Sequence, residues 1–364
     1  MSDLRQYKCP ACGGAMEFDS TIQKMKCPYC DTVMDVQEYQ NMQDAEYQNN
    51  AGSAGSGQWQ AMGGGAWQSG ETDGMCIYTC ESCGGEIIAD VSTGATTCPF
   101  CGNRIVMTGQ FSGDLRPDYI IPFKLDKNAA KKAYHRHLSG KKFMPAIFKK
   151  ENHIDEIKGL YVPFWLFDAD TEANIMYEAE RLRTWRSGDT EYTEHEIYNV
   201  QRAGRIGFSY LPEDCSRKMD DTLMESIEPY NFAEAVPFST AYLAGYMADR
   251  YDVAMEERME RAKQRIKRST IDAFKNTVQG YHSVKDVNSS VSLYNVRYLY
   301  ALYPVWILNT TWKGKKYTFA MNGQTGKMVG DLPFDKNAFN RFVITWGVVF
   351  GAIVYAIMWL FMLL

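Results

Sequence analysis

Two stretches of the chain are predominantly apolar and are rich in aromatic and β-branched residues. They are "LYVPFWLF" at 160–167 and "YPVWILNTTW" at 303–312. This composition favours buried strands. The following segment, 313–330, reads as consecutive turns and strands, because its Lys313-Gly314 and Asn322-Gly323 pairs supply the positive φ angles that tight hairpins require.

Other stretches repeat their apolar residues at helical spacing. Residues 249–278 place Met255, Met259, Ala262 and Ile266 at three- and four-residue steps, which gives one apolar stripe and predicts the longest helix of the chain at this place.

A shorter helix is predicted at 126–138, where Asp126 stands at the position of an N-cap.

The last 23 residues, Phe342 to Leu364, contain no charged side chain. A helix of this length is about 34 Å long, against about 30 Å for the hydrocarbon core of a bilayer. Lys336 and Arg341 precede it, and the positive-inside bias then holds residues 1–341 in the cytoplasm. We therefore predict a single-pass, tail-anchored protein of the cell membrane that contacts the bilayer through 342–364.

Residues 40–74 are rich in Gly, Gln, Ser and Asn, and they predict a flexible linker because such a stretch buries little apolar surface. Trp59 and Trp67 are unusual within it. They either pack loosely on a neighbouring module or form a short partner-binding motif that orders on contact.

A weak internal repeat occurs in the central part of the chain. "YIIPFKLD" at 119–126 is similar to "EAVPFSTA" at 234–241, and Pro163-Phe164-Trp165 is similar to Pro304-Val305-Trp306.

The prediction is an α+β fold with these parts: a zinc ribbon at 1–39, the linker at 40–74, a second zinc ribbon at 75–111, a body at 112–335 with a candidate duplication of 115–210 and 230–335, and a transmembrane helix at 342–364.

The composition is ordinary for a globular protein of 364 residues, with 45% hydrophobic and 23% charged residues. The formal net charge of −5 gives the whole chain no electrostatic reason to bind nucleic acid. The N-terminal residues are polar and do not resemble a secretory signal. The cysteines are therefore expected to be reduced thiols in the cytosol.

Eight of the ten cysteines form two copies of one motif. "KCPACGGAMEFDSTIQKMKCPYC" at 8–30 and "TCESCGGEIIADVSTGATTCPFC" at 79–101 each contain two Cys-x-x-Cys pairs, with fourteen residues between the inner cysteines. Two such pairs can place four thiolates around one tetrahedral Zn²⁺. The predicted ligands of two structural zinc ions are Cys9, Cys12, Cys27, Cys30, Cys80, Cys83, Cys98 and Cys101.

Iron bound as in rubredoxin is the alternative to zinc, and the short fourteen-residue insert favours zinc. With four protein ligands, no coordination position remains for water or substrate, so the metal would be structural. Glycine follows the second cysteine of three pairs, whereas Asp31 follows Cys30 and departs from the pattern.

Neither cysteine module carries the clustered basic residues that tracking a phosphate backbone requires. Residues 1–38 contain four Lys or Arg against six Asp or Glu, and residues 76–111 contain one against three. Protein partners are therefore expected, and nucleic acid is the alternative.

No other motif predicts chemistry. His135 and His137 are two apart on a predicted helix, His195 lies in a strand that turns its acidic neighbours away, and Cys215 and Cys76 have no assigned role. Phosphate loops, GxSxG and HExxH are absent from the sequence. We predict that the protein is not an enzyme and has no catalytic residues.

The charges of "EERMERAKQRIKR" at 256–268 run from acidic to basic, which complements the helix dipole. Glu257 can also pair with Arg261 one turn later. The alternative is that Arg265, Lys267 and Arg268 contact anionic lipid head groups.

The order of these parts resembles the YdjG-type double zinc-ribbon (TFIIB-like) membrane proteins of Gram-positive bacteria. The most specific similarities are the paired ribbons and "YTFAMNGQTGKMVGDLP" at 317–333, together with "YVPFWLFDA" at 161–169. The resemblance implies an association with PspA-like and SPFH-like proteins, which the membrane member would recruit to the cytoplasmic face in envelope stress. The predicted function is a membrane-anchored zinc-ribbon adaptor, and the alternative is a membrane-tethered nucleic-acid-binding protein. Partner surfaces and the oligomeric state do not follow from the sequence.

Overall fold

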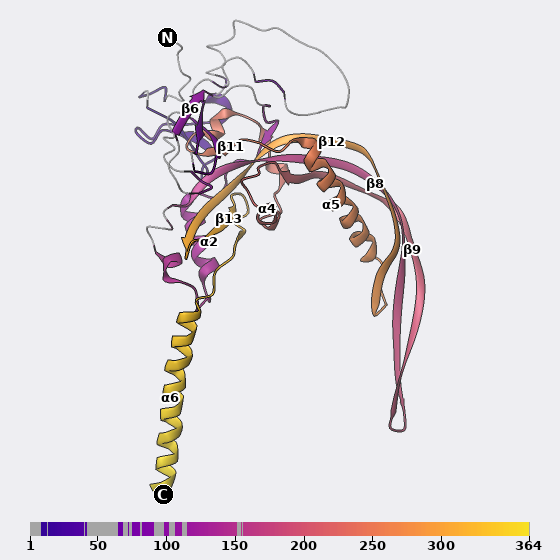
Figure 1. Cartoon of the computed structure of the whole chain (residues 1–364). Helices are drawn as coiled ribbons and strands as arrows, with labels where there is room; N and C mark the ends of the chain where they lie inside the picture. The colour runs from indigo at the N-terminus through magenta and orange to yellow at the C-terminus, as the bar shows by residue number, and fades with distance from the viewer. Residues whose placement is uncertain are drawn as a thin grey trace.

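A computed structural model of the chain describes residues 9–363 apart from 13, 40, 42–64, 68–71, 73–74, 81, 91–97, 102–105, 111–114, 151–153 and 155. Most of the predicted linker, including Trp59, lies outside the described residues. The structure has two groups of four cysteines near the N-terminus, a mixed body and one apolar helix at the C-terminus (Figure 1). The predicted α+β class is confirmed.

The first cysteine module, which we call ribbon 1, has a small sheet of its own. Its strands β1 (Glu17–Asp19), β2 (Lys24–Lys26) and β3 (Val33–Met34) pair in the order β1-β2-β3. Met16, Phe18 and Met25 are buried between this sheet and the body, where they share a cluster with Ala241 and Ala244.

The body is built on an eleven-stranded sheet, and the second cysteine module (ribbon 2) contributes to it. The main order is β10-β7-β12-β8-β11-β5-β4-β6, and β13, β14 and β9 pair off this path. The strands are β4 (Met75–Thr79), β5 (Glu86–Asp90), β6 (Val106–Gln110), β7 (Tyr119–Ile120), β8 (Lys158–Ser187), β9 (Thr190–Asp214), β10 (Val236–Pro237), β11 (Met247–Asp249), β12 (Ser283–Trp312), β13 (Lys315–Asn322) and β14 (Met328–Gly330).

The helices are α2 (Lys127–Leu138), α4 (Asp221–Ser226), α5 (Met255–Lys275) and α6 (Lys336–Leu363). Three short 3₁₀ helices are η2 (Ala146–Lys149), η3 (Phe232–Glu234) and η4 (Thr240–Leu243). The predicted cap of α2 is confirmed, because the Asp126 side chain accepts from Ala129 N at 2.7 Å. The predicted helix at 249–278 is confirmed only over Met255–Lys275, because Asp249 belongs to β11. The prediction that it is the longest helix is wrong, since α6 has 28 residues and α5 has 21.

The centre of the sheet is apolar on both faces, as the continuously hydrophobic runs predict. Alternate residues of β8 and β12 enter two different clusters: Tyr161 and Trp306 pack with α2, whereas Val162 and Ile307 pack with α4 and ribbon 2. The predicted strands 160–167 and 303–312 are therefore confirmed within β8 and β12, with the burial continuous over 160–167 and 303–308.

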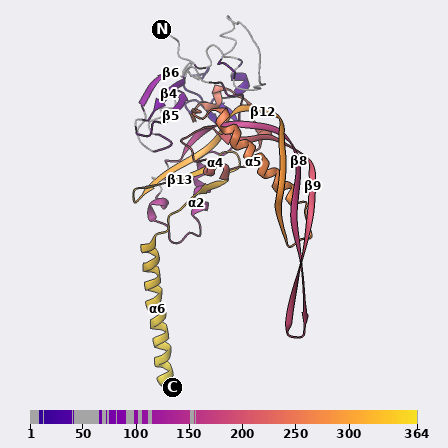
Figure 2. The ribbon, with the colours of Figure 1, turned by 45° about the vertical axis from the view of Figure 1, so that its right-hand side comes forward.

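Both strands continue far beyond the buried centre. β8 and β12 are 30 residues long, and with β9 they form a curved three-stranded arm, which we define as residues 170–208 and 283–294 (Figure 1). Helix α5 lies along the concave side of the arm (Figure 2). Ala173, Ile175, Tyr177 and Ala179 are buried beneath it, and the Tyr177 hydroxyl donates to Ile271 O at 2.8 Å.

The centre of the sheet has an approximate twofold arrangement. β7 pairs in parallel with residues 301–302 of β12, and β11 pairs in parallel with residues 160–161 of β8. These two positions are equivalent, because an offset of 141 residues relates them. The antiparallel β8–β12 register pairs Val162 with Tyr303, which the same offset relates. Segment 119–126 begins with β7 and segment 234–241 contains β10, and these two strands pair with each other.

The turn between β12 and β13 has the predicted backbone, since Lys313 and Gly314 have φ angles of 51° and 74°. The prediction for Asn322-Gly323 is wrong, because neither residue has a positive φ and Gly326, at 79°, makes the left-handed turn instead. Asn322 is fully buried, and its side chain accepts from Gln324 N and Thr325 N at 2.9 Å, which closes this turn.

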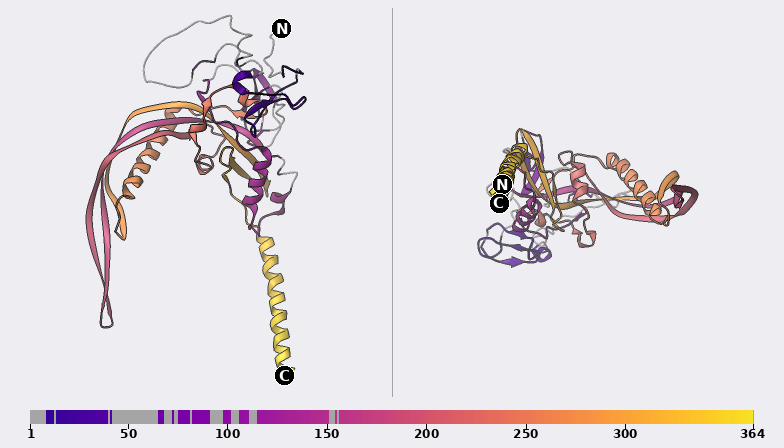
Figure 3. Two further views of the ribbon diagram at one scale, coloured as in Figure 1. Left: turned by 180° about the vertical axis from the view of Figure 1, so that it is seen from behind. Right: turned by 90° about the horizontal axis from the view of Figure 1, so that it is seen from below.

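Helix α6 leaves the body as a separate rod (Figure 1, Figure 3). At its base, the Phe143 ring contacts the rings of Phe334, Phe339 and Phe342. Its segment Lys336–Trp359 is long and apolar enough to cross a membrane, and none of it is buried in the described structure. The arm curves back toward the side on which α6 leaves the body (Figure 3, left).

Candidate metal centres and their contacts with the body

The structure brings the eight predicted ligands together in two groups of four. In ribbon 1 the group is Cys9, Cys12, Cys27 and Cys30, and in ribbon 2 it is Cys80, Cys83, Cys98 and Cys101. Within each group, all four sulfur atoms lie within 4.8 Å of one another.

The sulfur spacing fits a tetrahedral metal ion. Cys9 and Cys30 Sγ are 3.5 Å apart, and Cys80 and Cys101 Sγ are 3.4 Å apart. Four sulfurs at about 2.3 Å from a zinc ion would be about 3.8 Å from one another. Each group can therefore hold one metal ion, and the two modules fit zinc ribbons.

Each ribbon forms its first Cys-x-x-Cys turn in the same way. Cys9 N donates to Gly14 O at 2.7 Å, and Cys80 N donates to Gly85 O at 2.9 Å. The departure at Asp31 has a physical explanation, since Asp31 adopts the positive φ, 56°, that a glycine would adopt. Its carboxylate also pairs with Lys26 Nζ at 3.0 Å.

Hydrogen bonds favour the thiolate at two ligand positions. The Thr32 hydroxyl lies 3.1 Å from Cys30 Sγ, and this bond, with the Thr32 backbone N–H, lowers the pKa of Cys30 to about 6. Burial opposes ionisation of Cys80, but the backbone N–H groups of Cys83 and Ser82 outweigh it and lower the pKa of Cys80 to about 7. Thiolates are the form that binds metal.

The body contacts ribbon 2 directly at both Cys-x-x-Cys turns. Lys218 Nζ donates to Cys83 O at 2.5 Å. At the second turn, Asn309 donates to Pro99 O and Lys316 donates to Phe100 O. Ribbon 2 is therefore fixed to the sheet by side-chain donors as well as by the β5–β11 pairing.

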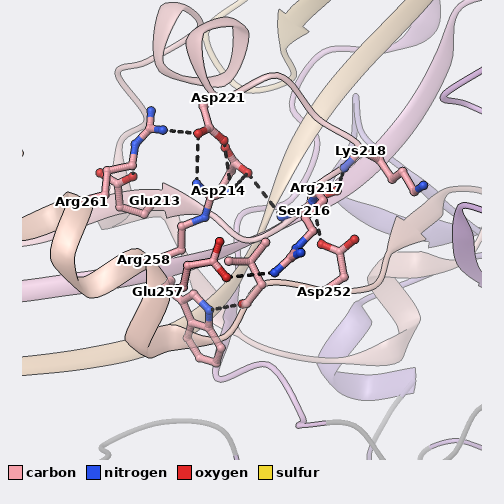
Figure 4. A network of polar contacts seen from close by, with 12 residues as sticks. Glu213, Asp214, Ser216, Arg217, Lys218, Asp221, Asp252, Glu257, Arg258 and Arg261 are labelled. Carbon is pink, nitrogen blue, oxygen red and sulfur yellow. Dashed lines mark hydrogen bonds and ion pairs between the residues drawn. The ribbon is translucent and has the colours of Figure 1, made fainter.

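A network of ion pairs lies beside these contacts, between the end of β9, α4 and α5 (Figure 4). Arg258 pairs with Asp214 at 3.2 Å and with Asp221 at 3.1 Å. Arg261 pairs with Asp221 and, at 2.9 Å, with Glu213. Motif spacing in the sequence does not reveal this network, because its partners are distant in the chain.

Burial raises the pKa of three carboxyl groups in this region, whereas the neighbouring arginines lower the pKa of Asp221. Desolvation, and then the Asp221 carboxyl, raise the pKa of Asp214 to about 8, although Arg258 lowers it. Desolvation also raises the pKa of Glu213 and of Glu228, which both pair with Arg265. Arg265 is thus occupied within the protein, whereas Lys267 and Arg268, the other basic residues considered for lipid contact, are exposed.

The histidines and cysteines to which the sequence assigned no chemistry contact other parts of the body or are buried in it. His137 Nε2 lies 2.9 Å from Gly330 O, and His195 pairs with Glu180 across the β8–β9 hairpin. Cys76 and Cys215 are buried, and burial raises the pKa of the Cys215 thiol. Trp67 packs edge-on against Phe238, with ring centroids 5.6 Å apart.

Comparison with known proteins finds a relative of nearly the same extent. The chain is similar to the uncharacterized protein YdjG of Bacillus subtilis (strain 168), with 34% identity over 309 residues. The similarity covers 71% of this chain and 90% of that protein. No protein-family model matches the chain, and no solved structure matches it.

Proposed function

The chain belongs to the YdjG family, and from this premise we propose that it is a tail-anchored adaptor of the cell membrane in a Gram-positive bacterium. In this proposal, two zinc ribbons and the α+β body hold protein partners on the cytoplasmic side. The activity is binding, and we propose no catalytic reaction.

The observation that carries the proposal is helix α6. It has 28 residues, and no residue of its apolar segment Lys336–Trp359 is buried in the described structure, where ring contacts with the body occur only at its base. A soluble protein would leave a large apolar surface in water, which is unfavourable, whereas a bilayer would cover it. Lys336 and Arg341 at its N-terminal end support a cytoplasmic body.

We propose that both four-cysteine groups bind zinc and that neither is catalytic. Four thiolates fill a tetrahedral site, so the metal would hold the fold of the ribbon and leave no position for a substrate. Reduced thiols also suit the cytoplasmic side of the membrane.

The proposed partners are PspA-like and SPFH-like proteins, which the membrane-anchored chain would recruit in envelope stress. The family resemblance suggests these partners, and the charge of the ribbons supports protein over nucleic acid. Residues 76–111 contain one basic side chain against three acidic ones, so ribbon 2 offers little attraction to phosphate.

The test compares cells that express the full chain with cells that express residues 1–341. We expect the PspA-like and SPFH-like proteins to be recovered with the membrane during envelope stress when the full chain is present. We expect their recovery there to fall when the anchor is deleted. An unchanged distribution of both proteins would contradict the adaptor function.

A further inference from the structure

We propose that the second Cys-x-x-Cys turn of ribbon 1, Cys27 to Cys30 with Tyr29 at its tip, is a docking surface for another protein. We call it the Tyr29 knuckle. The proposal rests on the adaptor function proposed above, because it names the surface through which the adaptor would hold a partner.

The two ribbons are structurally equivalent at this turn. An offset of 71 residues relates Tyr29 to Phe100, as it relates each cysteine of ribbon 1 to one of ribbon 2. Each aromatic ring lies over the glycine of the first turn so closely that a Cβ on Gly14 or Gly85 would be 2.7 Å from a ring carbon. The ring and the two turns therefore form one unit in both ribbons.

In ribbon 2 this unit is docked. Pro99 is buried and Phe100 is 4% exposed, within the apolar cluster that includes Val305 and Ile307 of β12. The Pro99 carbonyl accepts from Asn309, whose own Oδ1 accepts from Thr318 at 2.7 Å. The Phe100 carbonyl accepts from Lys316. In ribbon 2 this unit is thus held by an apolar cluster and two side-chain donors. A partner of the Tyr29 knuckle would have to supply the same two features.

In ribbon 1 the same unit faces solvent. Tyr29 is 76% exposed, and Pro28 and Cys30 are also exposed. Within the described part of the chain, no side chain donates to the carbonyl of Pro28 or of Tyr29.

Ribbon 1 is nevertheless held firmly on the body by its opposite end. Gln23, in the turn between β1 and β2, donates to Phe123 O at 2.6 Å, and Phe18 N donates to Ala244 O at 3.1 Å. The knuckle is therefore presented on a fixed support. A rigid exposed tyrosine is well suited to binding, because little conformational entropy is lost when it is covered.

The occupant we infer is a different protein with an apolar hollow rimmed by Lys or Asn side chains. A second copy of this chain does not fit, because its acceptor site at Asn309 and Lys316 already holds its own Phe100. The Asp31 side chain beside the knuckle pairs with Lys26 Nζ at 3.0 Å but is 83% exposed, so its carboxylate can also accept a basic side chain from the rim of a partner.

The test places the photo-crosslinker benzoylphenylalanine at Tyr29 of the full chain in its native membrane. The control site is Tyr294, a tyrosine of the arm that is 37% exposed. We expect crosslinks from position 29 to a segment of one other protein that contains Lys or Asn beside apolar residues, and none of these from position 294.

The purified crosslinked protein is then titrated against full-length variants in detergent. Loss of an aromatic anchor typically weakens binding by about 30-fold or more, so we expect this for Tyr29→Ala, a change within about twofold for Tyr294→Ala, and retained affinity for Tyr29→Phe. A second variant covers the case in which Tyr29→Ala loses the metal and no longer folds. Asp31→Asn leaves the aromatic ring in place and should weaken binding severalfold.

Three results would overturn the proposal. Protein crosslinks from position 294 with none from position 29 would reject the Tyr29 knuckle and leave the adaptor function standing. An absence of protein crosslinks from both positions would reject the knuckle and also count against the adaptor. Crosslinks from position 29 to lipid or to a second copy of this chain would likewise contradict the inferred occupant.

Discussion

Individual charged residues in the network of Figure 4 pair over long distances in the sequence. The expected contact of Glu257 with Arg261 is wrong, because Glu257 pairs with Arg217 at 2.9 Å and Arg261 pairs with Asp221 and Glu213. Glu213 is 3% exposed, and a buried carboxylate needs a partner more than a solvated one does. Helical spacing reveals only partners one turn away, so the sequence could not predict that Glu257 and Arg261 pair with distant residues instead of with each other.

The raised pKa of Asp214 predicts how stability depends on pH. The pKa is about 8 in the folded protein, against about 3.9 in an unfolded chain. Between these values the folded state holds a proton that the unfolded state lacks, so the free energy of unfolding should fall as the pH rises from about 4 to about 8. We expect Asp214→Asn to remove up to about 1 kcal/mol per pH unit of this slope.

Urea unfolding of the detergent-solubilised chain at pH 6 and pH 8 measures this effect. The control is Asp252→Asn, which changes an exposed carboxylate that accepts from Arg217 N in the same region. If the slope of Asp214→Asn equals that of the unmodified chain, Asp214 is not protonated in this range.

The ligand residues themselves give a second prediction. Changing Cys27 and Cys30 together to Ser removes two of four ligands in ribbon 1 and leaves ribbon 2 intact. Because a structural zinc site contributes folding energy, we expect metal content to fall from two ions per chain to one, with local loss of structure in ribbon 1. Metal analysis of the purified chain, with Cys215→Ser as the control, should show this, and two remaining ions would contradict the ligand assignment.

Among the elements, the centre of the fold was predictable and the arm was not. Residues 160–167 and 303–308 are buried on both faces, so their continuous hydrophobicity identifies them as strands. Beyond this centre β8 is buried only at alternate positions, such as Ala173, Ile175 and Tyr177. That two-residue alternation, with Glu172, Asn174 and Glu178 at the exposed positions, is present in the sequence and indicates a half-buried strand. It does not reveal the length of the strand or its pairing with β9 and with the distant β12.

The bracing of the arm by α5 gives a prediction at this scale. Ile175 is fully buried beneath α5, whereas the next residue, Met176, is 40% exposed on the other face. We expect Ile175→Ala to lower the free energy of unfolding by about 2–4 kcal/mol, and Met176→Ala to change it by about 0.5 kcal/mol or less.

Amide hydrogen exchange separates loss of the arm from loss of the whole fold. Ile175→Ala should increase exchange in 170–180 and 283–293 before it affects β13. Equal effects of Ile175→Ala and Met176→Ala would show that α5 does not brace the arm.

For the whole molecule, the metal centres were the best predicted feature and the docking of the ribbons the least. The four ligands of each centre lie close in sequence, so spacing alone brings them together. By contrast, the bonds from Lys218 and Lys316 to ribbon 2 join residues more than a hundred positions apart. Such contacts depend on the finished sheet, and the charge of a surface lysine does not reveal them.

Deletion of 342–364 tests the anchor at the scale of the molecule. The body has its own apolar clusters that do not include α6, so we expect residues 1–341 to fold and to appear in the soluble fraction. Sedimentation of lysed cells, with circular dichroism of the recovered protein, measures both outcomes. Continued recovery with the membrane would mean that the body binds lipid or a membrane partner.

The central claim is that α6 holds the ribbons and the body at the inner face of the membrane. The orientation is tested by protease treatment of intact protoplasts, with detection of ribbon 1 by an antibody. If α6 anchors the chain with its body inside the cell, the chain should survive until the membrane is permeabilised and should then be degraded. Degradation of ribbon 1 in intact protoplasts would contradict the cytoplasmic orientation. Its release into the soluble fraction without protease would contradict the anchoring by α6.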